Sequence, residues 1–160
     1  MGETRQEASE RELERARRIC LQLLAHRPRS EWEFRSRLTQ KGFDKRLVGL
    51  ILEWLRSAGL ADDREFARWW VESRKARGNL GRRGVEWELR AKGLERPVIL
   101  EALAEIDEPA EIRLGLEAVE RRRAGATEGD KARLLRWLRR RGFSPGAIQA
   151  IMRGPRRPDI

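Results

Sequence analysis

The hexapeptide LRRRGF at residues 138–143 is the third copy of a short pattern. The earlier copies are LTQKGF at 38–43 and LRAKGL at 89–94, so their glycines recur at intervals of about fifty residues. Each copy has a leucine, two variable residues, a basic residue, a glycine and a large apolar residue. A glycine shortly after an inward-facing leucine is typical of a helix that ends in a left-handed turn. The regular interval indicates a repeat protein.

The residues around each copy predict a three-helix unit whose middle helix ends at the glycine. Tyrosine is absent and β-branched residues are scarce, whereas apolar residues return at helical spacing. Ser30 with Glu33 and Asp62 with Glu65 have the spacing of capping boxes, and Asp44 and Ser144 are further caps. Apolar pairs one turn apart precede the three glycines: Phe34 and Leu38, Val85 and Leu89, Leu134 and Leu138. We therefore predict an all-α protein with nine helices.

The predicted domains are three tandem three-helix repeats. Residues 1–60 form repeat 1, in which a polar tail precedes the three helices. Residues 61–107 form repeat 2, and residues 108–153 form the basic repeat 3. Residues 154–160 are predicted to be a flexible basic tail. About fifty residues bury little surface alone, so neighbouring repeats should support one another. Stacked helical repeats predict an elongated, curved body.

The charge is concentrated near the C-terminus. The formal net charge is +10, of which +3 falls on residues 1–108 and +7 on residues 109–160. This excess indicates a polyanionic partner, such as nucleic acid, an acidic protein surface or anionic lipid, although it could serve solubility alone. No segment has the apolar length of a membrane span, and the polar N-terminus is unlike a signal peptide. The single cysteine suits a reducing cytoplasm.

The sequence has no recognisable catalytic, metal or cofactor motif. His26 reads as a helix-end residue and Cys20 as a packing residue, while Asp62 and Asp63 read as a helix start. The segment GNLGRRG at 78–84 lacks the Gly-Lys-Ser/Thr ending of a phosphate loop. Its GRRG resembles the loop of KH domains, but the strands of such a domain are absent. We expect no enzyme activity, no metal and no cofactor.

Three groups of basic residues are candidates for contact with a polyanion. The basic position of the pattern is Lys41, Lys92 and Arg141, and the position after the leucine is Thr39, Arg90 and Arg139. A cation there can equally complement the helix dipole. The middle helix of repeat 3 carries more cations than its dipole needs: Lys131, Arg133, Arg136, Arg139, Arg140 and Arg141. Arg82 and Arg83 begin the middle helix of repeat 2, where a cation opposes the dipole, which suggests a functional use.

The aromatic residues divide into two groups. Phe34, Phe43, Phe66, Trp70 and Phe143 follow the core period. Trp69, Trp87 and Trp137 do not, and three roles stay open for them: stacking on bases, docking on a protein, or packing between repeats.

Three segments together resemble the RecX regulatory protein family: RSEWEFRSRLTQKGF, GLADDREFARWWVESRKARGNLGRRGVEWELRAKGL and RLLRWLRRRGFSPGAIQAIM. The resemblance covers roughly residues 13–153. The sequence departs from the family pattern at Ile19-Cys20, where we expect a tyrosine, and in its many tryptophans. The motif and structural positions are Leu38, Gly42, Asp62, Asp63, Phe66, Trp70, Arg74, Gly81, Leu89, Gly93, Leu138 and Gly142.

The resemblance implies a regulator of DNA recombination and repair. RecX-like proteins bind the RecA recombinase and its filament on single-stranded DNA, lie in the filament groove, and restrain ATP hydrolysis and strand exchange. It implies a cytoplasmic protein, which we expect to be a monomer that also binds double-stranded DNA weakly. The alternative is a stand-alone helical nucleic-acid-binding protein with no recombinase partner.

Overall fold

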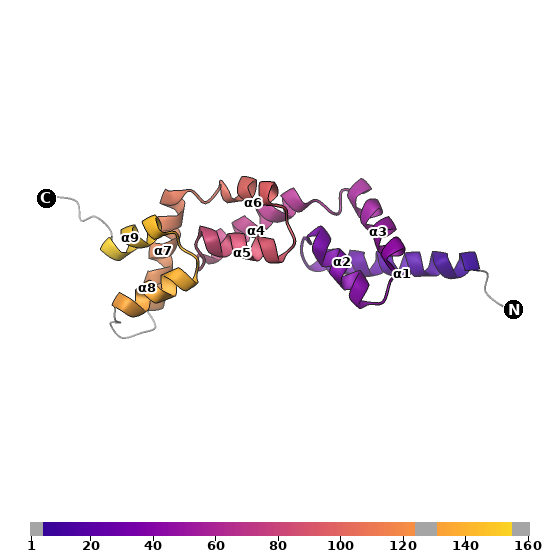
Figure 1. The fold of residues 1–160 in the computed structure, drawn as a ribbon, viewed down its shortest axis with the longest axis horizontal. Coiled ribbons are helices and arrows are strands. Elements are labelled where there is room, and N and C mark those ends of the chain that lie inside the picture. Colours follow the sequence, from indigo (N-terminus) through magenta and orange to yellow (C-terminus); the bar gives the residue numbers. More distant parts are fainter. Residues whose placement is uncertain (1–4, 124–130, 155–160) are drawn as a thin grey trace. The chain divides into compact units, whose positions relative to one another are not determined.

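The computed structural model describes residues 5–123 and 131–154, and every regular element in these ranges is a helix. Figure 1 shows the nine helices of these ranges in chain order. Their bounds are α1 Arg5–His26, α2 Glu31–Gln40, α3 Lys45–Ser57, α4 Asp63–Arg77, α5 Arg82–Ala91, α6 Arg96–Leu103, α7 Glu108–Arg123, α8 Lys131–Arg140 and α9 Pro145–Arg153. The all-α prediction is confirmed. The predicted break at Gly125, the cap at Thr127 and the tail at 155–160 lie outside the described residues.

The predicted helix starts are confirmed by side-chain caps. Ser30 Oγ accepts a hydrogen bond from the Glu33 backbone N–H, and Glu33 accepts one from the Ser30 N–H, which makes a complete capping box. Asp44 and Ser144 accept from the backbone of Leu47 and Ala147. Asp62 accepts from the N–H groups at the start of α4. Each bond satisfies a backbone donor that a helix start would otherwise leave unpaired.

The three pattern glycines end α2, α5 and α8, as predicted. Gly42, Gly93 and Gly142 have φ angles of +88°, +76° and +74°, a region that other residues enter at a cost. After the turn, the apolar residue of each pattern returns to the core: Phe43, Leu94 and Phe143 are all buried.

The first compact unit consists of the described residues up to Phe66 together with Lys92–Leu94. Its core is formed by α1, α2 and α3 and contains Ala16, Cys20, Phe34, Leu38, Phe43, Leu47, Val48, Ile51, Leu52 and Leu55. Phe34, Leu38, Ile51 and Leu55 are fully buried.

The second compact unit consists of Ala67–Ala91 and the described residues from Glu95 onward. Within it α5 contacts α6, while α9 contacts both α7 and α8. A Cβ atom on Gly115 of α7 would lie only 2.2 Å from Cδ1 of Ile151, so this glycine permits the close approach of α9. The predicted repeat boundaries at 60, 107 and 153 stay a prediction.

Three details differ from the sequence-based expectations. The last helix of repeat 2 ends at Leu103 rather than near Ile106. Leu134 is only partly buried, unlike Phe34 and Val85 at the equivalent positions. Trp70 is also only partly buried, because its indole N–H donates to the Glu88 carboxylate at 2.8 Å instead of entering the core.

Candidate nucleic-acid interface

The turn after α8 docks directly on the start of α5. The backbone N–H of Gly81 donates to the carbonyl of Arg141 at 2.9 Å, and the N–H of Arg83 donates to the carbonyl of Gly142 at 3.0 Å. A Cβ atom on Gly142 would lie 2.1 Å from the backbone nitrogen of Gly84. Glycines on both sides therefore let two backbones meet, and their hydrogen bonds fix α8 relative to α5.

The turn after α5 makes a related contact on the start of α2, within the first unit. Ser30 Oγ donates to the carbonyl of Lys92 at 2.8 Å, and the Lys92 ammonium lies 2.9 Å from the Glu33 carboxylate. A Cβ atom on Gly93 would lie 2.4 Å from the Cβ of Trp32. The turn at Gly42 differs, since nothing lies within 4 Å of a Cβ placed there.

A buried carboxylate holds the second unit together at the same place. Glu111 of α7 is 2% exposed and accepts 2.9 Å hydrogen bonds from the backbone N–H groups of Arg82 and Ser144. It also accepts from the Ser144 hydroxyl at 2.6 Å. These donors lie at the N-terminal ends of α5 and α9, where the helix dipole favours a negative charge. Sequence reasoning did not identify Glu111, because its partners lie far away along the chain.

Arg82 and Arg83, the two predicted contact residues at the start of α5, have different surroundings. The Arg82 guanidinium donates to the carbonyl of Ile106 at 3.3 Å, which is a contact inside the unit. The Arg83 side chain is exposed. The expected conflict of Arg82 with the helix dipole is offset by the Glu111 carboxylate at the same helix end.

Two other predicted cations already lie against carboxylates. Arg90 lies 2.6 Å from Glu86, and Lys92 pairs with Glu33. Burial alone would raise the pKa of Glu33, but hydrogen bonds from Arg27 and Lys92 together hold it below its ordinary value. The capping and docking contacts of Glu33 therefore involve a carboxylate that stays ionised at neutral pH.

The cations of α8 are different. Lys131, Arg133, Arg136, Arg139 and Arg140 are all exposed, and α8 has no acidic residue. None of these five has a carboxylate partner within the part of the chain that the structure describes. Arg141 is partly buried, and its guanidinium lies 5.7 Å from the ring centre of Trp137.

Trp69, Trp87 and Trp137, the tryptophans that do not follow the core period, have different surroundings. The guanidinium groups of Arg122 and Arg141 lie 5.2 and 5.7 Å from the ring centre of Trp137. Trp69 meets Trp70 edge to face, with ring centres 5.9 Å apart. Trp87 is 54% exposed.

The family-motif residues of α4 make structural contacts. Arg74 Nε lies 2.6 Å from Glu88 of α5, and its guanidinium covers the Trp70 ring at 4.6 Å. Asp63 accepts a hydrogen bond from the backbone N–H of Glu31, and Phe66 is buried. These residues therefore position helices, which leaves the exposed α8 cations and Arg83 as the basic candidates without a carboxylate partner among the described residues.

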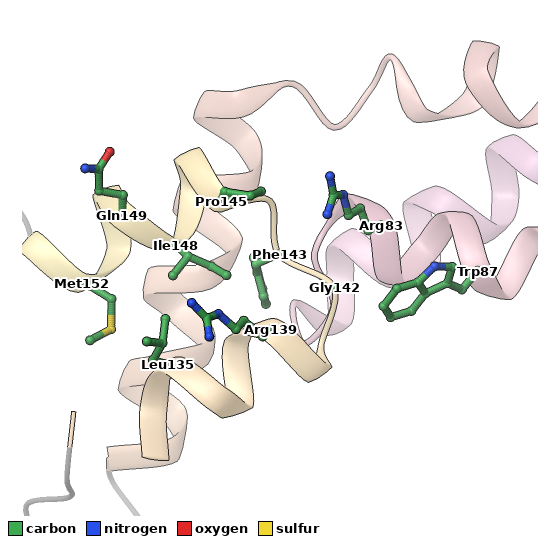
Figure 2. Close-up of a pocket in the computed structure, with 10 residues that line it drawn as sticks. All are labelled: Arg83, Trp87, Leu135, Arg139, Gly142, Phe143, Pro145, Ile148, Gln149 and Met152. Atoms are coloured by element: carbon green, nitrogen blue, oxygen red, sulfur yellow. The ribbon is translucent and has the colours of Figure 1, made fainter. Parts of the chain in front are cut away.

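A groove of about 600 Å³ lies beside these cations, entirely within the second unit. Figure 2 shows Arg83 and Trp87 on α5, Leu135 and Arg139 on α8, and Ile148, Gln149 and Met152 on α9. Phe143, which follows the docked turn, lies between these helices.

No helix among the described residues is long and apolar enough to cross a membrane.

Comparison with known proteins identifies the family. Residues 16–55 match the model of the first three-helix domain of RecX, and residues 62–103 match that of the second. The regulatory protein RecX of Amycolatopsis mediterranei is 35% identical over 148 residues, which cover 90% of this chain and 85% of that protein. The regulatory protein RecX of Mycobacterium sp. strain KMS is 39% identical over 139 residues, covering 82% and 76%.

Solved structures show the same fold. The crystal structure of RecX from Lactobacillus salivarius superimposes with a TM-score of 0.76 at 18% identity, and it covers 90% of this chain and 96% of that one. A second crystal structure of a regulatory protein RecX gives the same TM-score at 22% identity, covering 94% and 78%. The matched domains, the sequence identity to curated relatives and the shared fold lead to one conclusion: this chain belongs to the RecX family of regulatory proteins.

Proposed function

We propose that this protein binds the RecA recombinase and its filament on single-stranded DNA, and that it restrains ATP hydrolysis and strand exchange by the filament. Membership of the RecX family supports a regulatory role. Such a protein would act in the cytoplasm as a monomer, and its binding to double-stranded DNA without recombinase would be weak.

The observation that carries the proposal is the uncompensated charge of α8. Arg136 lies three or four positions from Arg133, Arg139 and Arg140, so three of its four neighbours at these spacings on the helix are cations. Like charges at these spacings destabilise a helix by roughly 0.2–0.5 kcal/mol for each pair. A polyanion in contact with α8 would remove that repulsion. The phosphates of a DNA strand and the acidic groups of a filament groove both have the required charge.

The proposed contact residues are those predicted from the sequence, in a revised order and without Arg82. Lys131, the exposed arginines of α8 and Arg83 come first, because they have no carboxylate partner among the described residues. Arg90 and Lys92 come second, since a partner would have to compete with Glu86 and Glu33 for them. Arg82 is assigned a structural role instead.

The deciding experiment is a titration of RecA ATPase activity on single-stranded DNA with this protein. We expect inhibition at concentrations well below that of RecA, because a bound regulator would act on the filament rather than on free DNA. If inhibition begins only when the protein saturates the DNA, the protein is a competitor for DNA and the stand-alone binder is the correct function. A complex with RecA in the absence of DNA, measured by sedimentation, would separate protein contact from DNA contact.

A further inference from the structure

The groove between α5, α8 and α9 brings together an exposed indole, an apolar floor and two arginines. Trp87 lies at one end of the groove, and Gln149 and Met152 lie at the other (Figure 2). The floor is apolar and includes Leu135, Phe143 and Ile148. The charged side chains that line it are those of Arg83 and Arg139, and no carboxylate is among the lining residues.

We infer that this groove is a base-stacking site for single-stranded nucleic acid, where the Trp87 indole stacks on an unpaired base and Arg139 binds a neighbouring phosphate. The inference rests on the proposed function for the identity of the strand, which is the DNA of the filament. It adds a specific mode of binding to the general attraction of a basic helix.

Trp87 has the exposure that base stacking requires. Its side chain is 54% exposed, and the described residues give it no hydrogen bond, ring contact or cation contact. By contrast, the Trp70 indole N–H donates a hydrogen bond to Glu88, and two guanidinium groups contact the Trp137 ring. An exposed indole beside arginines is the arrangement that binds nucleic acid bases without sequence preference.

Arg139 has no acidic partner one turn earlier on its helix, because repeats 2 and 3 differ at that position. In repeat 2 the equivalent arginine, Arg90, lies 2.6 Å from Glu86, four positions earlier on α5. In repeat 3 the residue four positions before Arg139 is Leu135, which lines the groove. One replacement of an acid by a leucine thus leaves the cation uncompensated and makes the floor apolar. Both effects favour an anionic ligand with a flat apolar part.

The shape and composition of the groove favour unpaired bases over a duplex or a peptide. A base inside a duplex is already stacked and paired, so it cannot reach a recessed floor. The amide of Gln149 can donate and accept hydrogen bonds at a base edge. An acidic peptide would satisfy the arginines, but it would leave the exposed face of Trp87 without a flat partner.

The test compares two single strands of equal length, measured by fluorescence anisotropy in the absence of recombinase. One is oligo(dT), and the other is an abasic oligomer with the same phosphates and no bases. We expect Trp87→Ala to weaken binding of oligo(dT) roughly tenfold and to leave binding of the abasic strand unchanged. Trp87→Phe should keep most of the affinity. Arg139→Gln should weaken binding of both strands and lower the salt slope by about one.

Matched controls are available in the first unit. Trp32 is 47% exposed on α2, and Arg46 is exposed on α3. Trp32→Ala and Arg46→Gln should not change the discrimination between oligo(dT) and the abasic strand. Thermal melting by circular dichroism should show that Trp87→Ala keeps its fold, as expected for a half-exposed side chain.

Three results would overturn the inference. Equal weakening of both strands by Trp87→Ala would show that Trp87 does not stack on bases. Equal effects of Trp87→Ala and Trp32→Ala would remove the assignment to this groove. Binding of polyglutamate that depends on Trp87 and displaces oligo(dT) would identify an acidic-peptide site instead. The proposed function fails separately: if the wild type does not inhibit RecA but Trp87 still discriminates between the strands, only the regulatory proposal falls.

Discussion

The hydroxyl of Ser144 donates a 2.6 Å hydrogen bond to the carboxylate of Glu111, a side chain that is 2% exposed. The same carboxylate accepts the backbone N–H of Ser144 and that of Arg82, so it touches the N-terminal ends of both α9 and α5. No cation pairs with it in the described ranges. Two helix ends therefore meet at this buried carboxylate, which contributes to the placement of the groove residues on α5 and α9.

Replacement of Glu111 should therefore be costly. Glu111→Ala leaves two backbone N–H groups and a hydroxyl without their acceptor, and we expect the free energy of unfolding to fall by about 3 kcal/mol or more. Glu111→Gln keeps one acceptor oxygen and should cost less, about 1–2 kcal/mol. Urea unfolding followed by circular dichroism measures both values.

The control for this prediction is Glu117→Ala on the exposed side of the same helix. It removes the same formal charge and should change the free energy of unfolding by about 0.5 kcal/mol or less. If the two alanine variants unfold alike, the hydrogen bonds of Glu111 do not contribute to stability.

The structural features that could be predicted from the sequence are those formed by residues close together along the chain. Ser30 with Glu33 predicts a cap because its hydrogen bonds span three residues, and Gly142 predicts a helix end because the turn is closed within one segment. Glu111 could not be found in this way, since it lies 33 positions before Ser144 and resembles any acid in a first helical turn. The groove was missed for the same reason. Trp87 and Arg139 were each singled out, but only the docking of the α8 turn on α5 brings them to one surface.

The glycine turns offer a comparison in which backbone strain is matched. Gly42 and Gly142 both have positive φ, but only Gly142 has a neighbour, with the Gly84 nitrogen 2.1 Å from an added Cβ. Gly42→Ala should cost about 1 kcal/mol, the usual penalty for alanine in the left-handed region. Gly142→Ala should cost at least 2 kcal/mol more, since the two backbones must separate and lose their hydrogen bonds.

Chemical denaturation of the two glycine variants tests this comparison directly. Equal losses of stability would mean that the close approach of the α8 turn to α5 does not contribute to the fold. A loss at Gly42 larger than that at Gly142 would contradict the assignment of Gly42 as the turn without a docking partner.

Cys20 provides a prediction of pH dependence. Its side chain is fully buried in the core of the first unit, and burial raises the pKa of the thiol to about 11. Because the folded pKa is raised, this group stabilises the fold below the unfolded pKa near 9, and the contribution is lost as pH rises toward 11. We expect slow reaction with a disulfide reagent at pH 8 in the native protein and fast reaction in urea.

Cys20→Ala is the matched variant for this prediction. The difference in stability between the wild type and Cys20→Ala should shrink as pH rises from 9 to 11, whereas the titration of other groups cancels in the difference. Fast labelling of native Cys20 at pH 8 would contradict its burial.

The last prediction concerns α8, where function and stability should oppose each other. Arg136, Arg139 and Arg140 are exposed and adjacent on the helix surface, and none has a carboxylate partner in the described part of the chain. Changing all three to Gln keeps helix propensity similar and removes their mutual repulsion. We therefore expect the melting temperature to stay equal or to rise at low salt, while inhibition of RecA ATPase and binding to DNA both weaken. The matched control replaces Arg18, Arg46 and Arg68 with Gln, which removes three exposed charges from other helices.

The two triple variants separate contact from net charge. If both weaken DNA binding equally, only the total charge matters and α8 is not a binding surface. If the α8 variant loses DNA binding but still inhibits the recombinase, the contacts that inhibit are made to the protein, and exposed Arg83 on α5 becomes the next residue to change. If the α8 variant is clearly less stable than the wild type at low salt, its arginines hold the fold and do not repel one another. Raising the salt concentration should stabilise the wild type more than the α8 variant, because screening weakens a repulsion that only the wild type has.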